Sequence, residues 1–142
     1  VITESIAICR YFEVLNPDPP LFGKGAKGVA EVDMWTRRVE LRLGTPLSMV
    51  WQHTHPFTAR VVVPQYKEFG ESNRPKVVDA MRFIDAALAN RPWLAGEDFS
   101  IADITLLCMI DFGIAIGVAL PGELEHLKAW HDRAVARPSA QA

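Results

Sequence analysis

The longest apolar run of the chain, ITLLCMIDFGIAIGVAL, spans residues 104–120 and contains a single charged residue, Asp111. Asp103 precedes the run and Pro121 ends it. In a bilayer centre an aspartate costs about 2.5–3.5 kcal/mol on insertion scales, and the run is barely long enough to span. We therefore expect a helix that is buried on all sides within a helical bundle, and no membrane association.

Apolar residues recur at helical spacing in three further segments, whose other positions are mostly polar. These stripes are Val32, Trp35, Val39 and Leu43; Val77, Met81, Ile84 and Leu88; and Leu124, Leu127, Trp130 and Ala134. The Gly-Thr-Pro sequence at 44–46 should kink or break the first of these helices. Because the stretch at 60–63, whose composition is β-rich, has no partner strand, the chain is predicted to be all-α, with about five helices around the apolar run.

The amino-terminal residues form a separate short pattern. Ile2, Ile6, Cys9 and Phe12 predict a helix over residues 1–15, and the three prolines and three glycines of residues 16–28 predict a linker. Residues 29–142 then form the main helical domain. Since the chain begins with Val1 rather than Met, we expect it to be part of a longer protein.

Charge and residue usage exclude several classes of protein. Fifteen basic and seventeen acidic residues give a net charge of −2, without the positive surface that nucleic-acid binding requires. Two distant cysteines and no CxxC motif favour a reducing, cytoplasmic location. His53 and His55 have no third ligand at a suitable spacing, so no metal site is expected.

The strongest local motif is FSIADI, at residues 99–104. Ser100 is placed to cap a helix through the backbone N–H of Asp103, and the Asp103 carboxylate is placed to reach back to the N–H of Ser100. Phe99 and Ile104 occupy the positions of a hydrophobic staple. We expect a structural capping box, whose removal at either residue costs about 1–2 kcal/mol.

The segment WLAGEDFSIADITL, at residues 93–106, resembles the start of the buried core helix in the carboxy-terminal domain of glutathione S-transferases. The helices predicted before it and at residues 127–142 resemble the flanking helices of that family, in the same order. On this resemblance the chain is identified as a member of the family, of bacterial type, with its carboxy-terminal helical bundle at residues 29–142. The resemblance implies that residues 1–15 are the last helix of an amino-terminal thioredoxin-like domain.

The sequence TESIAI, at residues 3–8, followed by Tyr11, is similar to the glutathione-binding segment of that domain. The resemblance implies that Ser5 and the helix-start N–H groups hold the γ-glutamyl carboxylate, and that Glu4 holds the ammonium group. A helix amino terminus with a hydroxyl donor is suited to a carboxylate, and a neighbouring acid to an amine. The alternative is that Thr3 or Ser5 is a plain helix cap.

In the family the first helix of the helical domain lines the pocket for the electrophile. Arg37, Leu41, Gly44 and Ser48 are spaced i, i+4, i+7 and i+11, with Thr45 adjacent, so one helix face could supply this wall and Gly44 could leave room for a ligand. A solvated face with a kink is the alternative.

The family's thiolate-activating residue lies upstream of this chain, so the resemblance implies no catalytic residue here. It implies glutathione as co-substrate, a small electrophile as the second substrate and a homodimer. The type of reaction stays open. The competing hypothesis is a non-catalytic protein-interaction domain of the same fold.

Overall fold

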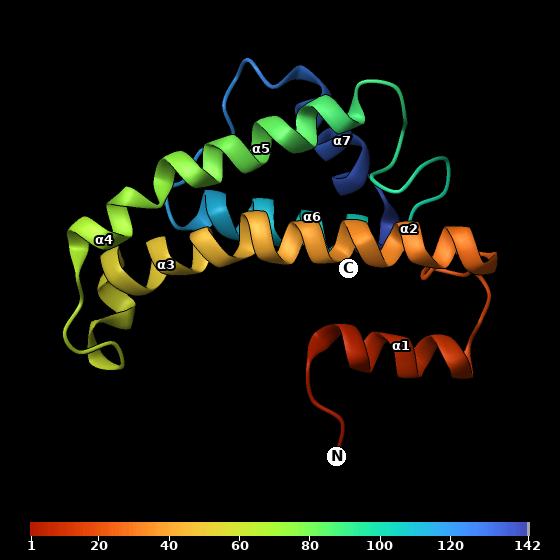
Figure 1. Ribbon diagram of the computed structural model, residues 1–142, viewed down its shortest axis with the longest axis horizontal. Helices are drawn as coiled ribbons and strands as arrows, with labels where there is room; N and C mark the ends of the chain where they lie inside the picture. Colours follow the sequence, from red (N-terminus) through yellow and green to blue (C-terminus); the bar gives the residue numbers. More distant parts are fainter. Residues whose placement is uncertain (142) are drawn as a thin grey trace.

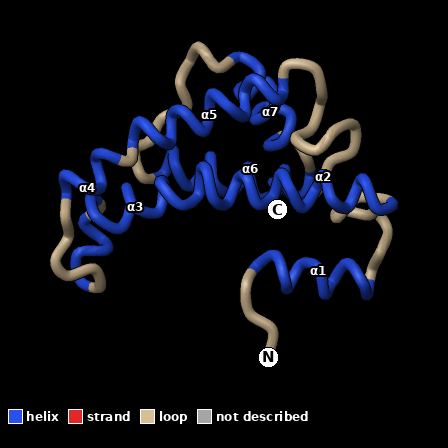
Figure 2. Tube along the Cα trace, in the orientation of Figure 1, coloured by secondary structure: helices blue, strands red, loops and turns tan. Residues whose placement is uncertain are grey.

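The computed structural model describes residues 1–141, and within them every regular element is helical (Figures 1 and 2). The α-helices are α1 (Ser5–Leu15), α2 (Gly25–Arg38), α3 (Thr45–Thr54), α4 (Lys67–Ser72), α5 (Arg74–Leu88), α6 (Ile101–Ala115) and α7 (Glu125–Val135). A π-helix, η1 (Val39–Gly44), and two 3-10 helices, η2 (Pro56–Arg60) and η3 (Pro138–Ala140), complete the set. The all-α class is confirmed. Ala142 of the predicted carboxy-terminal segment lies outside the described residues.

The chain does not break at the Gly-Thr-Pro sequence. Helices α2 and α3 continue one another through η1 and form the long rod that crosses Figure 1. The N–H of Thr45 donates to the carbonyl of Glu40, five residues earlier, and the hydroxyl of Thr45 donates to the same oxygen at 3.2 Å. A π turn therefore accommodates Pro46, which has no N–H and which an α-helix interior does not tolerate.

Helix α6 lies at the centre of the main core, in contact with α2, η1 and α7. All the residues of the three predicted apolar stripes are buried. The prediction that the apolar run is buried on all sides is wrong, because Cys108, Asp111 and Ile114 are exposed and the helix ends at Ala115. Cys108 is thus exposed although it lies within the apolar run. Within residues 1–141 no helix has the length and apolarity needed to cross a bilayer.

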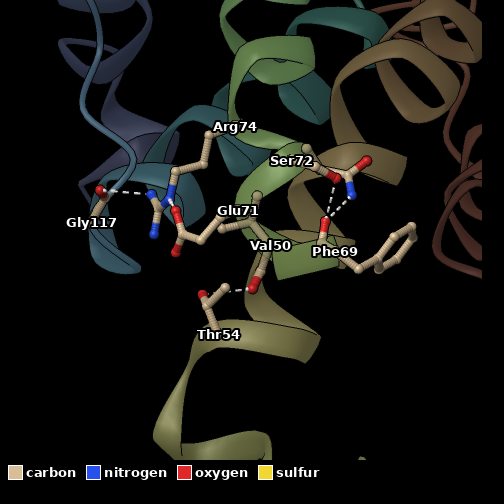
Figure 3. Close-up of polar contacts among 8 residues, drawn as sticks. Val50, Thr54, Phe69, Glu71, Ser72, Arg74 and Gly117 are labelled. Atoms are coloured by element: carbon tan, nitrogen blue, oxygen red, sulfur yellow. Dashed lines mark hydrogen bonds and ion pairs between the residues drawn. The ribbon is translucent and has the colours of Figure 1, made fainter. Parts of the chain in front are cut away.

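Helices α3 and α4 pack closely at the end of the rod, where Gly70 is buried (Figure 3 shows the neighbouring polar contacts). A Cβ on Gly70 would lie 2.5 Å from Cγ2 of Thr54 and 3.0 Å from Cβ of His53, so this approach requires glycine. At the start of α5, Arg74 donates a hydrogen bond of 3.3 Å to the carbonyl of Gly117, which ties α5 to the chain beyond α6.

Helix α1 lies apart from the main core, beneath α2 in Figure 1, and has no buried residue. Ile6 and Cys9 pack against a small second core made by Phe22, Val32 and Ile101. Helix α2 begins at Gly25, inside the segment predicted as linker. The sequence did not indicate this start, because the first turn is rich in glycine and carries no apolar periodicity.

Candidate functional site

The start of α1 has an unusual backbone. Glu4, the residue before the helix, has φ 69 and ψ 122, and among the described residues it is the one non-glycine residue with a positive φ. A side chain in this region costs about 1–3 kcal/mol of strain, which structures tend to retain at functional positions. The strained backbone therefore marks Glu4 as a candidate functional residue.

No side chain caps α1. The alternative that Thr3 or Ser5 is a plain N-cap is therefore wrong: the capping position belongs to Glu4, and Ser5 is the first helical residue. Both Glu4 and Ser5 are exposed. Glu4 and Ser5 thus lie at the positive end of the helix dipole, beside first-turn N–H groups that no side chain caps.

Polar contacts made by Glu13 and Arg10 help to hold α1 in place. The two carboxylate oxygens of Glu13 accept the backbone N–H groups of Leu21 and Phe22, each at 3.0 Å. Arg10 forms an ion pair with Asp33 on α2. The orientation of α1, and with it the position of Glu4 and Ser5, is therefore set by the loop that follows and by α2. In Figure 1 the first turn of α1 lies below the middle of the α2–α3 rod.

The predicted pocket residues are distributed unevenly. Arg37, Leu41 and Thr45 are exposed, and Leu41 is 57% exposed although its side chain is apolar. Met34, one turn before Arg37, is 39% exposed and extends the same series, a residue that the spacing argument missed. Arg37 also pairs with Glu40 at 2.7 Å. Together they form an exposed strip, which we call the α2 strip. It has two apolar side chains, one ion-paired cation and one hydroxyl: Met34, Leu41, Arg37 and Thr45.

Gly44 and Ser48 differ from the α2 strip because the π turn changes the helical register. Both are half-buried. A Cβ on Gly44 would lie 3.3 Å from Sδ of Met109 on α6, so the missing side chain serves helix packing rather than ligand space. The Ser48 hydroxyl accepts a hydrogen bond of 2.8 Å from the amide of Gln52.

Ser100 and Asp103 form the predicted capping box at the start of α6. Asp103 Oδ2 accepts the N–H and the hydroxyl of Ser100, each at 3.0 Å. Its Oδ1 accepts the N–H of Leu94 at 2.8 Å and Nε1 of Trp130 at 2.9 Å. Burial raises the pKa of the Asp103 carboxyl above its ordinary value, and these hydrogen bonds oppose that rise. All four donors belong to the protein itself, which gives Asp103 a structural role.

The histidines do not assemble a metal site. The Nδ1 atoms of His53 and His55 accept backbone N–H groups, those of Tyr66 and Phe57, each at 3.2 Å. His131 pairs with Asp111 at 2.7 Å. Across residues 1–141, no three His, Cys, Asp or Glu side chains converge in a way that could hold a metal ion.

The fold has clear structural relatives. The crystal structure of Gtt2 from Saccharomyces cerevisiae superposes with a TM-score of 0.93 at 35% identity, over 99% of this chain and 68% of that one. A glutathione S-transferase domain-containing protein from Marinobacter aquaeolei superposes with a TM-score of 0.91 at 30% identity, over 98% of this chain and 68% of that one. The bundle is therefore of the class formed by the helical domains of glutathione transferases.

Sequence comparison agrees with the structural class. Residues 47–138 match the family model of the glutathione S-transferase C-terminal domain. The curated glutathione S-transferase 2 of Saccharomyces cerevisiae is 35% identical over 142 residues, which cover 99% of this chain. The chain belongs to the glutathione S-transferase C-terminal domain family. It spans 61% of the length of that yeast relative.

Proposed function

We propose that this chain is the helical part of a glutathione transferase, and that Glu4 and Ser5 bind the γ-glutamyl end of glutathione. The observation that carries the proposal is the strained backbone of Glu4 directly before an uncapped helix start. The free N–H groups and the Ser5 hydroxyl suit the α-carboxylate, and the Glu4 carboxylate suits the ammonium group beside it. The names of two relatives, both of which contain the term glutathione S-transferase, support glutathione as the co-substrate.

The test is calorimetric titration of glutathione into the full-length protein and its Glu4→Ala and Ser5→Ala variants. Loss of a hydrogen bond to a charged group should weaken binding by about 10- to 100-fold in each variant. Glu125→Ala and Ser139→Ala, also at exposed positions, serve as matched controls and should leave the affinity unchanged. Unchanged affinity in both test variants would remove Glu4 and Ser5 from the site.

The α2 strip is our candidate for the wall of the electrophile pocket. It offers the apolar surface of Met34 and Leu41 and the guanidinium of Arg37. A small electrophile with an apolar body could pack on this surface, since ligand sites combine apolar walls with a few polar groups. Thr45 belongs to the exposed part of this wall, whereas Gly44 and Ser48 would support it from within the helix.

We further propose that residues 1–15 belong to a thioredoxin-like domain, that residues 16–28 join it to the helical domain, and that residues 29–142 form that domain. The family resemblance puts the thiolate-activating residue in the thioredoxin-like part, so residues 1–142 alone should not catalyse conjugation. Exposed apolar side chains on α1 that lie outside its contacts with the following loop, such as Ile8, Tyr11 and Val14, support a covering partner for that helix.

The competing function is a non-catalytic interaction domain. The same glutathione titration separates the two, because a pure docking domain has no use for glutathione. We expect the full-length protein to be a homodimer, which light scattering during gel filtration would reveal as twice the monomer mass.

A further inference from the structure

A groove of about 360 Å³ runs between α1, the loop that follows it and the start of α6. Its walls are apolar and come from Cys9, Phe12, Leu21 and Ile104, above a floor made by Phe22 and Ile101. The floor belongs to the small second core, where Phe22 is 4% exposed and Ile101 is 2% exposed. Sites for small molecules have this size and character and often lie where two structural units meet.

Hydrogen bonds to backbone groups of the loop fix the shape of the groove. The Glu13 carboxylate accepts the N–H groups of Leu21 and Phe22, which anchors the loop to α1. The N–H of Ile101 donates to the carbonyl of Leu21 at 2.9 Å, which anchors the same loop to α6. The apolar walls are thus pre-formed, and a ligand would lose little free energy to ordering them.

The polar rim of the groove is acidic. Its polar lining residues are Glu13, Asn16 and Asp18, and the lining includes no lysine, arginine or histidine. Asp18 is exposed and, within the described part of the chain, forms no ion pair. Arg10 stacks over the Phe22 ring at 4.3 Å, but Asp33 balances its charge.

We propose that this groove binds a small organic cation, with an apolar or aromatic body against the Ile104 wall and an ammonium group at Asp18. The apolar walls provide the burial and the acidic rim selects the charge. Glutathione carries a net negative charge, so the same rim disfavours it. The groove is therefore a second ligand site, separate from the start of α1.

Cys9 and Cys108 provide an internal test. Cys9 lines the groove and is half-buried, whereas Cys108 is exposed on α6. In the intact protein, the rate of N-ethylmaleimide labelling at each cysteine is followed by peptide mass spectrometry, with and without phenethylammonium chloride. We expect the probe to slow labelling at Cys9 severalfold and to leave the rate at Cys108 unchanged. Equal rates at Cys9 with and without the probe would overturn the proposal.

The charge requirement has its own controls. Asp18→Asn keeps the shape of the side chain and should weaken probe binding by about two- to fivefold, the size expected for a partly exposed ion pair. Asp132→Asn, at an exposed position of α7, should have no effect. Uncharged 2-phenylethanol should protect Cys9 less than the ammonium probe does, and equal protection would overturn the selection of a cation.

A second readout does not depend on thiol chemistry. In amide NMR spectra of the same protein, the probe should shift the resonances of Leu21 and Ile104 and leave those of α7 in place. Shifts confined to other regions would place the probe elsewhere and contradict the assignment of the groove.

Discussion

Nε1 of Trp130 on α7 donates a hydrogen bond of 2.9 Å to Oδ1 of Asp103 on α6, and both side chains are fully buried. The same oxygen accepts the N–H of Leu94, and Oδ2 accepts both donors of Ser100. One carboxylate thus joins the start of α6, the turn before it and the last long helix. Asp103 connects parts of the chain that a simple capping box does not reach.

Asp103→Ala should therefore cost more than the 1–2 kcal/mol expected from a lost cap. Removing the carboxylate leaves the N–H groups of Leu94, Ser100 and Trp130 buried without an acceptor. Since each such donor costs about 1–3 kcal/mol, the free energy of unfolding should fall by at least about 3 kcal/mol. Urea unfolding followed by circular dichroism measures the change.

Ser100→Ala is the matched control, because it removes one hydroxyl and leaves the carboxylate with three donors. The expected loss is about 0.5–2 kcal/mol. If both variants lost the same free energy of unfolding, the hydrogen bonds to Leu94 and Trp130 would contribute nothing measurable.

The raised pKa of Asp103 gives a defined pH dependence. A carboxyl with a pKa above its ordinary value of 3.8 in the folded state takes up its proton there before it does so in the unfolded chain. Between these two pKa values the folded state binds more protons, so this group's contribution to stability falls as pH rises. The difference in unfolding free energy between the parent protein and Asp103→Asn should be larger below pH 3.8 than at neutral pH.

Other acids titrate in the same range, but they are common to both proteins and cancel in the difference. Urea unfolding at a series of pH values provides the measurement. A difference that grew as pH rose would show that the pKa of Asp103 is lowered instead.

Gly70→Ala should destabilise the contact between α3 and α4. The new Cβ would overlap Cγ2 of Thr54, and overpacking of this kind costs about 1–3 kcal/mol. Gly122→Ala is the control, because nothing lies within 4 Å of its Cβ position, and it should stay within about 0.5 kcal/mol. Thermal unfolding reports both, and Thr54→Ser should partly rescue the Gly70→Ala variant.

Glu13→Ala should loosen α1 while the main core stays intact. The N–H groups of Leu21 and Phe22 would lose their acceptor. A buried donor left without an acceptor costs about 1–3 kcal/mol of stability, and water reduces this cost at a part-buried site. Limited proteolysis should cut the loop after α1 faster, and glutathione affinity should fall because Glu4 and Ser5 move. Glu97→Ala, an exposed loop substitution, should change neither property.

Leu41→Ala tests the α2 strip in the full-length protein. The side chain is 57% exposed, so its loss should change the unfolding free energy by no more than about 0.5 kcal/mol. If Leu41 lines the electrophile pocket, the KM for an apolar electrophile should rise while the affinity for glutathione stays the same. An unchanged KM would leave Leu41 as a surface residue.

The helices were predictable because their signals are local. The stripes that end in Leu43, Leu88 and Ala134 are buried as their spacing indicated, since residues three and four apart share one face of a helix. The capping box at Ser100 was predictable for the same reason, because its partners lie within one helical turn.

The candidate site was predictable only in part. The assignment of Glu4 and Ser5 to glutathione binding rests on the family resemblance of residues 3–8 and stays a prediction, and the positive φ of Glu4 has no sequence signal. Spacing placed Gly44 and Ser48 with Leu41, and this assumed an unbroken α-helix. The π turn before Pro46 moved them, because a five-residue hydrogen-bond step rotates everything that follows it.

By itself the sequence determined the helical class, the buried faces of the three amphipathic helices and the cap of α6, because each depends on neighbours within about one or two turns of the chain. Only the tertiary structure decided that Asp103 also binds Trp130, that Gly70 lets α3 and α4 meet, and that one face of α6 stays exposed. These are contacts between segments far apart in sequence. They follow from how the helices pack in space, which no local pattern records.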